Sequence, residues 1–236
     1  MKKYVTIIFI LLSIQSAYSQ ERESAFSIDL GADIVSRYIW RGINLSESPA
    51  IQPTIGLTYN DLTFGSWGSF TVARETIQEV DLFLTYEKQY FSITINNYYN
   101  TLDTLGFSGN YFQLSGSSTP HALEGVIAVN GPESLPLSLS AATMFWGNDR
   151  DEDGTNLFST YIELSYPFTA NEIETSAFIG ITPANGYYHD KFGVVNLGFS
   201  MVKEIRITDN FSLPLMGSFM VNPVQEKVFL VFGVTL

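Results

Sequence analysis

Cysteine is absent from this 236-residue chain, and histidine occurs only twice, at His121 and His189. Without cysteine the chain has no disulfide bonds, no thiolate metal ligands or nucleophiles, and no cysteine for lipid attachment. Neither histidine lies in a motif with a catalytic serine, and no G-x-S-x-G, P-loop or dinucleotide-binding fingerprint occurs. The sequence therefore predicts a protein that is not an enzyme.

Charged residues are also scarce, at 15% of the chain, compared with about a quarter in an ordinary soluble domain. Only 12 of them are Lys or Arg, against 24 Asp or Glu, which gives a formal net charge of −12. We expect no nucleic-acid partner, because phosphate binding needs a basic surface. Aromatic residues, in contrast, reach 14%. Few charges and many aromatic rings are typical of a wall that faces hydrocarbon.

Beyond the first twenty residues, no segment has 18 consecutive apolar residues, so no transmembrane helix is expected. The chain starts with two lysines, an apolar run over Val5–Leu12 and the small-x-small sequence Ala17-Tyr18-Ser19. This layout is typical of a cleaved secretory signal, the alternative being a retained N-terminal anchor. The sequence predicts a signal peptide over residues 1–19 and one exported domain over residues 20–236.

Apolar and polar residues alternate with period two from residue 25 to the C-terminus. The expected strands are 25–40, 49–59, 62–73, 77–87, 90–100, 121–130, 135–146, 157–167, 172–182, 191–205, 211–221 and 226–236. Each has about ten residues or more, which is the length that a tilted membrane strand needs. Their number is even, as is usual for single-chain bacterial barrels. The pattern predicts an all-β fold, an antiparallel up-and-down transmembrane β-barrel of about 12 strands.

The connections between these segments fall into two classes. Even-numbered links are tight turns, at 60–61, 88–89, 131–135, 169–171 and 208–210. Most odd-numbered links are longer, at 41–48, 101–120, 147–156 and 183–190, with short ones at 74–76 and 222–225. Outer-membrane barrels have short periplasmic turns and long external loops, so both termini should face the periplasm.

Aromatic residues gather near the predicted strand ends, for example Tyr38, Trp40, Tyr98, Phe145 and Phe158. Two aromatic girdles at the lipid–water interfaces would explain this placement. Aromatics in the core of a soluble β-sandwich are the alternative, although core aromatics should favour strand centres.

Charged side chains on the polar face should point into the barrel, because a charge facing lipid costs several kcal/mol. The candidates for the lumen lining are Asp29, Asp33, Arg37, Arg41, Glu79, Asp81, Glu124, Glu163 and Glu174, to which Glu87, Glu204 and Arg206 can be added. Arg37 and Arg41 are expected to pair with Asp29 and Asp33. The set predicts either an acidic path for solutes or a structural network of charges across the lumen.

The loop over residues 148–154 contains Asp149, Asp151, Asp153 and Gly154 at the spacing D-x-D-x-D-G. Carboxylates at such spacing can converge on Ca²⁺, which makes Ca²⁺ the one cofactor to consider. The twelfth position, however, is Thr160 instead of glutamate. A solvated acidic loop outside the cell is the alternative interpretation.

One part of the sequence resembles a known protein family, beyond its alternation of apolar and polar residues. The segments Ala32–Ser46 and Pro49–Pro53, followed by Trp67-Gly68-Ser69 and Glu79-Val80-Asp81, resemble the opening of the TorF-type porin family of outer-membrane barrels. The positions that carry the resemblance are Ser36, Tyr38, Arg41, Gly42 and Gln52. It covers about 50 residues, and Phe70 departs from the asparagine that the family usually has after W-x-S. The resemblance implies an outer-membrane barrel, in a family whose porin activity is itself inferred.

Together these observations predict an outer-membrane channel of a Gram-negative bacterium for small cationic or neutral polar solutes. The alternatives are a non-conducting structural or adhesive barrel and, with least support, an outer-membrane hydrolase. The expected partners are outer-membrane lipid, small solutes and the barrel assembly machinery. The apolar alternating last strand, Val228–Leu236, resembles the signal that this machinery recognises, although Leu236 replaces its usual terminal aromatic residue.

Overall fold

The computed structural model describes residues 25–73, 78–100, 110–114 and 118–236, so the predicted signal peptide and parts of the links 74–76 and 101–120 lie outside the described residues. The described part forms the strands β1 (Phe26–Val35), β2 (Tyr38–Trp40), β3 (Ile43–Ser46), β4 (Ala50–Tyr59), β5 (Leu62–Thr71), β6 (Gln78–Lys88), β7 (Phe91–Tyr99), β8 (His121–Asn130), β9 (Ser138–Gly147), β10 (Thr160–Ala170), β11 (Ile173–Thr182), β12 (Gly193–Thr208), β13 (Phe211–Asn222) and β14 (Lys227–Thr235). Among these residues, no helix has the length and apolar character needed to cross a membrane.

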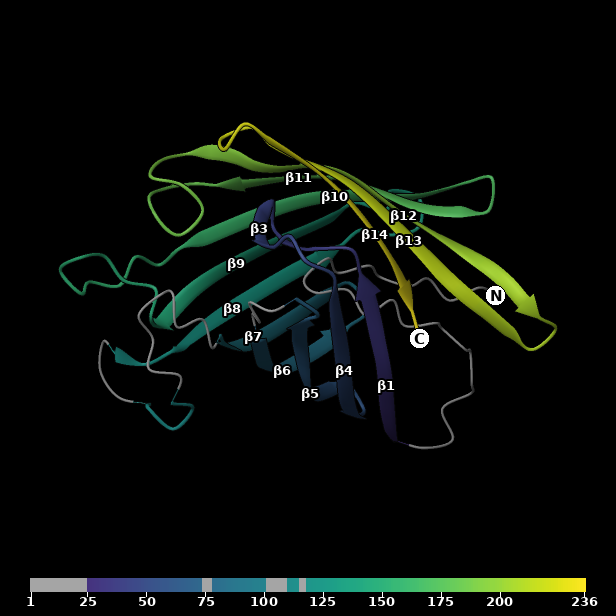
Figure 1. The fold of residues 1–236 in the computed structure, drawn as a ribbon, viewed down its shortest axis with the longest axis horizontal. Coiled ribbons are helices and arrows are strands. Elements are labelled where there is room, and N and C mark those ends of the chain that lie inside the picture. Colours follow the sequence, from purple (N-terminus) through teal and green to yellow (C-terminus); the bar gives the residue numbers. More distant parts are fainter. Residues whose placement is uncertain (1–24, 74–77, 101–109, 115–117) are drawn as a thin grey trace.

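Twelve of the strands close into one antiparallel barrel in the order β1-β14-β13-β12-β11-β10-β9-β8-β7-β6-β5-β4 (Figure 1). This confirms the predicted fold class. The seam between the first and last strands pairs Asp33 with Thr235 and Val35 with Gly233. At one end of the seam, Ala32 and Leu236 exchange backbone hydrogen bonds of 3.2 and 2.9 Å. Closure removes the exposed edges that an open sheet would present.

The alternation assigned from the sequence matches the two faces of the wall. In β4, Ile51, Ile55 and Leu57 are exposed on the outside, whereas Gln52 is buried inside. The same holds around the barrel, where large apolar side chains such as Leu30, 74% exposed, form the outer surface. Because successive side chains of a strand point to opposite faces, the intervening polar residues line the lumen.

The two ends of the barrel differ in their connections (Figure 1). At one end, the short-turn end, two-residue turns join Tyr59 to Leu62, Ala170 to Ile173 and Thr208 to Phe211. The positive φ angles of Asn171 and Glu172, 50° and 66°, are typical of the tight hairpin turns that match strand twist. The opposite end, the long-loop end, carries the longer connections after β9 and β11. β1 starts at the short-turn end, since Phe26 pairs with Tyr59.

The prediction of one strand over 25–40 and an external loop over 41–48 was wrong. The chain stays in the wall until Ser36, which forms two hydrogen bonds with Phe232 of β14. The backbone N–H of Ser36 donates to the carbonyl of Phe232 at 2.7 Å, and the backbone N–H of Phe232 donates to the hydroxyl of Ser36 at 3.0 Å. The chain then leaves the wall and forms β2 and β3, a separate two-stranded sheet. Its two-residue turn consists of Arg41 and Gly42, with φ angles of 50° and 78°. We call residues Tyr38–Ser46 the lumen hairpin.

Candidate functional site in the barrel lumen

The backbone at the tip of the lumen hairpin lies against β12 and β13, which follow β14 in the barrel wall. The side-chain amide of Asn222, at the end of β13, donates to the carbonyl oxygen of Gly42 at 3.0 Å. A Cβ on Gly42 would overlap the carbonyl of Val195 in β12. Glycine is therefore required here both for the close approach and for the positive φ. The hairpin thus lies inside the lumen near its long-loop end, with its tip against β12 and β13.

Arg41, at the hairpin tip, forms a bidentate ion pair with Glu124 of β8. Its two terminal nitrogens donate to the two carboxylate oxygens at 2.5 and 2.9 Å. The guanidinium also donates to the hydroxyl of Tyr188 and lies over the rings of Trp40 and Tyr161, at 4.7 and 4.9 Å from their centroids. Arg41 is charged, because a guanidinium keeps its proton in proteins.

Glu124 is completely buried, and the wall supplies its remaining partners. The hydroxyl of Tyr98 in β7 donates to it at 2.7 Å, and the side-chain amide of Asn96 lies at 3.5 Å. A buried carboxylate needs such partners, because an unpaired charge in a low dielectric is costly. The predicted pairing of Arg41 with Asp29 or Asp33 was therefore wrong, since Arg41 pairs with a residue 83 positions away.

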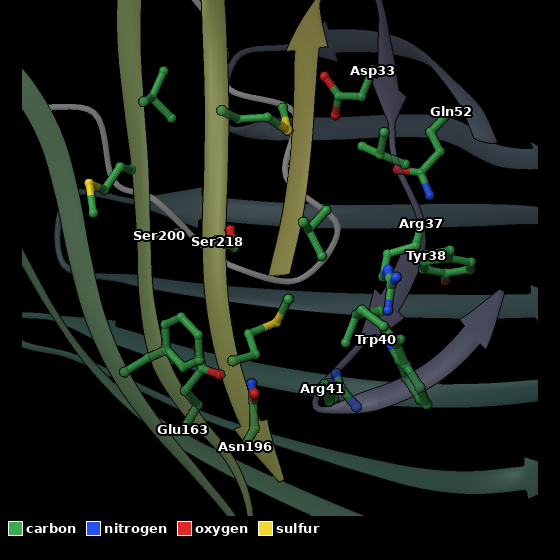
Figure 2. Close-up of a pocket in the computed structure, with 18 of the residues that line it drawn as sticks. Asp33, Arg37, Tyr38, Trp40, Arg41, Gln52, Glu163, Asn196, Ser200 and Ser218 are labelled. Atoms are coloured by element: carbon green, nitrogen blue, oxygen red, sulfur yellow. The ribbon is translucent and has the colours of Figure 1, made fainter. Parts of the chain in front are cut away.

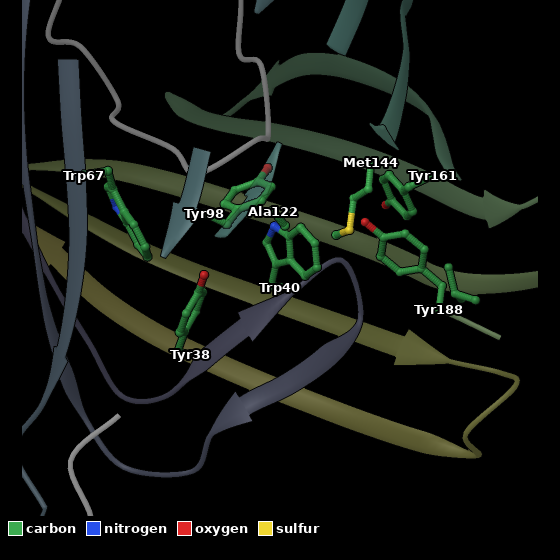
Figure 3. Close-up of a cluster of buried hydrophobic side chains, with 9 residues drawn as sticks. Tyr38, Trp40, Trp67, Tyr98, Ala122, Met144, Tyr161 and Tyr188 are labelled. Carbon is green, nitrogen blue, oxygen red and sulfur yellow. The ribbon is translucent and has the colours of Figure 1, made fainter. Parts of the chain in front are cut away.

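Aromatic side chains of a buried cluster (Figure 3) contact this ion pair. Trp40 lies between Tyr98 and Tyr188, with ring centroids at 5.6 Å in both cases, and Tyr188 continues to Tyr161 at 5.5 Å. These rings are buried in the lumen, so the placement of Tyr38, Trp40 and Tyr98 in an interfacial girdle was wrong for these three residues. The predicted girdle residues Phe145 and Phe158, in contrast, are exposed, at 43% and 57%.

The other lumen candidates occupy two levels. Near the hairpin, Asp33, Glu79, Asp81 and Glu163 are all buried, with 2–8% of their surface exposed. Toward the short-turn end, Asp29 is half-buried, while Glu174, Glu87, Glu204 and Arg206 are exposed. All of these residues occupy inward positions of the strand alternation.

The buried carboxylates differ in how well they are paired. Asp33 accepts from the hydroxyl of Thr235 at 2.7 Å, and Glu163 accepts from the hydroxyl of Tyr161. Asp81 accepts from the backbone N–H of Tyr99 at 3.2 Å. One oxygen of Asp81 and one of Glu79 are buried without a hydrogen-bond partner in the described part of the chain. This region of the lumen therefore has an excess of acidic groups.

A cavity of about 140 Å³ lies between the lumen hairpin and the barrel wall, to which β1, β4, β5 and β10–β14 contribute lining residues (Figure 2). Predicted lumen residues Asp33, Arg37, Arg41 and Glu163 line it, together with Gln52 of the family motif. Arg37 forms no hydrogen bond or ion pair with any residue that the structure describes, so its predicted pairing with Asp29 or Asp33 was also wrong.

The acidic loop after β9 uses its aspartates to shape turns. Asp149 accepts from the backbone N–H and the hydroxyl of Ser159 at 2.8 and 2.5 Å. Asp151 accepts from the N–H groups of Asp153 and Thr155 at 3.1 and 2.8 Å. Within the described ranges, no three Asp, Glu or His side chains are grouped to hold a metal ion. The predicted Ca²⁺ ligands are therefore not brought together.

The two histidines lie near the long-loop end. His121 stacks among Tyr99 and Tyr111, with ring centroids at 5.1 and 5.0 Å, and its Nδ1 lies 3.0 Å from the amide oxygen of Asn97. His189 lies 3.0 Å from Asp190, in the link before β12. Neither histidine hydrogen-bonds a serine among the residues described.

The site residues that sequence reasoning missed include Tyr161, Tyr188 and Asn222. Tyr161 could have been found, because it lies two residues before Glu163 and so faces the lumen by alternation. Tyr188 lies in a link without periodicity, and the contact of Asn222 depends on how the hairpin folds inward, so neither had a local signal.

The fold and the site define a closed twelve-stranded antiparallel barrel with a hairpin inside its lumen. Comparison of the chain with known protein families and with curated proteins found no match. The resemblance of residues 32–81 to TorF-type porins stays a prediction.

Proposed function

We propose that this chain is exported and forms an outer-membrane β-barrel. The exposed outer surface supports the proposal, because its apolar side chains would be costly in water and suit hydrocarbon. The separation of short turns from long loops is also that of outer-membrane barrels. In this proposal, the short-turn end faces the periplasm and the long-loop end faces outward.

We further propose that the lumen passes small cationic or neutral polar solutes and that the lumen hairpin forms the constriction. The observation that carries this proposal is the charge of the lumen around the hairpin. Five buried carboxylates, Asp33, Glu79, Asp81, Glu124 and Glu163, lie there. The lumen arginines at this level are Arg37 and Arg41, and Arg41 is neutralised by Glu124. Acidic groups in a narrow lumen with low-dielectric walls attract cations and repel anions.

A non-conducting structural barrel is the second candidate function. The observations that favour it are the bidentate Arg41–Glu124 pair and the aromatic cluster, which hold the hairpin inside the lumen. The two candidates differ in the expected effect of Arg41→Ala. If the barrel is a channel, Arg41→Ala loosens the constriction and should raise the conductance. If the barrel is structural, the rest of the lumen remains filled and the conductance should stay at zero.

The test is the conductance of the refolded protein in a planar bilayer, followed by the reversal potential across a salt gradient. We expect cation selectivity that weakens as salt shortens the screening length. The double variant Glu79→Gln/Asp81→Asn should reduce this selectivity. Its matched control is Glu152→Gln, which removes a carboxylate from the exposed loop after β9. Anion selectivity, or a selectivity that the double variant leaves unchanged, would contradict an acidic constriction.

A further inference from the structure

The cavity beside the lumen hairpin contains polar groups that the protein itself does not satisfy. Arg37 lines it without an ion pair or hydrogen bond to any described residue, and its Nε is buried. Asn196, only 5% exposed, also lines it, and its amide oxygen has no partner although its nitrogen donates to Tyr161 at 3.0 Å. Native proteins satisfy most buried polar groups, so unsatisfied ones around a cavity point to a missing partner.

The charges around the cavity come from two sides. Arg37 comes from the segment that leads into the hairpin, whereas Glu163 and Asn196 come from the opposite wall (Figure 2). Asp33 adds a second carboxylate from β1. Arg41 also lines the space, but Glu124 neutralises it. The cavity therefore offers one free guanidinium and two carboxylates.

Apart from Gln52, Ser200 and Ser218, the rest of the lining is apolar, and β11, β13 and β14 contribute much of it. Phe178, Met220 and Val231 line the cavity, together with Ile39 of the hairpin. Phe178 and Met220 pack with each other in a buried cluster, against which Ile39 and Val231 lie. The wall is therefore preformed and would remove an apolar group from water.

We propose that this cavity binds a small zwitterion with an apolar side chain, that is, an apolar α-amino acid. The Arg37 guanidinium would receive the carboxylate. Glu163 and the free amide oxygen of Asn196, which lie on the same side of the cavity (Figure 2), would accept hydrogen bonds from the ammonium group. The apolar wall would receive the side chain. This inference rests on the proposed function and names the class of neutral polar solute that the lumen holds.

Ligands with a single charge fit the same groups less well. A carboxylate without an amine would face Asp33 and Glu163 with no positive group to offer them. An amine without a carboxylate would leave Arg37 without an anionic partner. Arg37 is half-buried and the two carboxylates are buried, and a charge withdrawn from water without a partner is unfavourable, so a ligand with both charges is preferred. The volume of about 140 Å³ is well below that of sites for drug-sized ligands, about 300–1,000 Å³, so the occupant is small.

Binding can be measured on the full chain refolded in detergent, by the fluorescence of Trp40 and Trp67, which line the cavity. The probes are L-leucine, isocaproate, which lacks the amino group, and isoamylamine, which lacks the carboxylate. We expect saturable binding of L-leucine and affinities at least about tenfold lower for both analogues, since leaving one buried charge unpaired costs more than a factor of ten. Equal affinities for the three probes, or no binding of any, would overturn the site.

Two variants test the assignment of the charges. Arg37→Gln should abolish the preference for L-leucine over isoamylamine, and Glu163→Gln the preference over isocaproate. The matched controls Arg206→Gln and Glu174→Gln change exposed lumen residues and should leave binding unchanged. Arg37→Lys keeps the positive charge and should retain part of the affinity for L-leucine. A gel-mobility assay tests whether each variant is folded. Loss of binding in the controls but not in Arg37→Gln would overturn the assignment.

The bilayer measurement separates this inference from the proposed function. A barrel that conducts but does not bind L-leucine would overturn the site and support the channel. A barrel that binds L-leucine but never conducts would support the site and overturn the channel.

Discussion

Replacing Arg41 with alanine tests whether the buried ion pair stabilises the barrel. The change removes the hydrogen bonds of 2.5 and 2.9 Å to Glu124 and the cation–π contact of 4.7 Å with Trp40. It leaves the Glu124 carboxylate buried with only neutral partners, Tyr98 and Asn96. Removing one member of a buried ion pair costs about 3–5 kcal/mol, because the other charge is left uncompensated. We expect the free energy of unfolding to fall by that amount.

The assay is a urea titration of the barrel refolded into lipid vesicles, followed by tryptophan fluorescence and by gel mobility. The double variant Arg41→Ala/Glu124→Ala should lose less stability than Arg41→Ala alone, because no uncompensated charge remains. The control is Arg206→Ala, whose partner Asp209 is 92% exposed, so the loss should be less than about 1 kcal/mol. A double variant as unstable as Arg41→Ala would refute the reasoning.

Three further predictions concern the hairpin, the wall and the orientation. Gly42→Ala should lower the free energy of unfolding by about 1–3 kcal/mol in the same titration, because the φ of Gly42 is 78° and a Cβ there would overlap a carbonyl of β12. An unchanged urea midpoint would contradict this. Leu84→Arg places a charge on the exposed outer face and should lower the free energy of unfolding in lipid by about 2–4 kcal/mol. Thr85→Arg places the charge on the lumen face and should lower it much less. Equal losses would mean that the two faces are assigned wrongly. Because the chain has no cysteine, each of the variants Glu152→Cys and Asp209→Cys contains a single thiol. Glu152 lies in the long loop after β9 and Asp209 in the short turn between β12 and β13, so an impermeant maleimide on intact cells should label only the Glu152→Cys variant. Labelling of the Asp209→Cys variant alone would reverse the orientation.

The wall of the barrel could be predicted because its pattern is local. Each strand alternates between an exposed apolar outer face and a polar lumen face, so Ile51 and Gln52 indicate their faces without knowledge of the neighbouring strands. The break after β1 could not be predicted in this way, because Tyr38 and Trp40 continue the alternation of the strand. What ends β1 is the hydrogen bonding of Ser36 to Phe232, a residue 196 positions away.

The candidate site was predicted in part for the same reason. Alternation indicated that Glu124 and Glu163 face the lumen, and both are buried there. The partner of Arg41 was not predicted, because the acids expected to pair with it, Asp29 and Asp33, lie on the wall strand that the hairpin leaves. Pairing with Glu124 depends on the register of the wall strands from β1 to β8 and on the inward fold of the hairpin, neither of which leaves a local signal.

The position of the hairpin directly after β1 has a consequence for how the chain assembles. Its contacts join residues far apart in the sequence, with separations of 83 for Glu124, 147 for Tyr188 and 180 for Asn222. The bonds that close the wall are of the same kind, with a separation of 202 between Asp33 and Thr235. Such contacts form late, because a long loop must be closed before they can stabilise anything. Since β1 forms one side of the closing seam and leads straight into the hairpin, zipping of the seam and docking of the hairpin should occur in one kinetic phase, without an empty barrel as an intermediate.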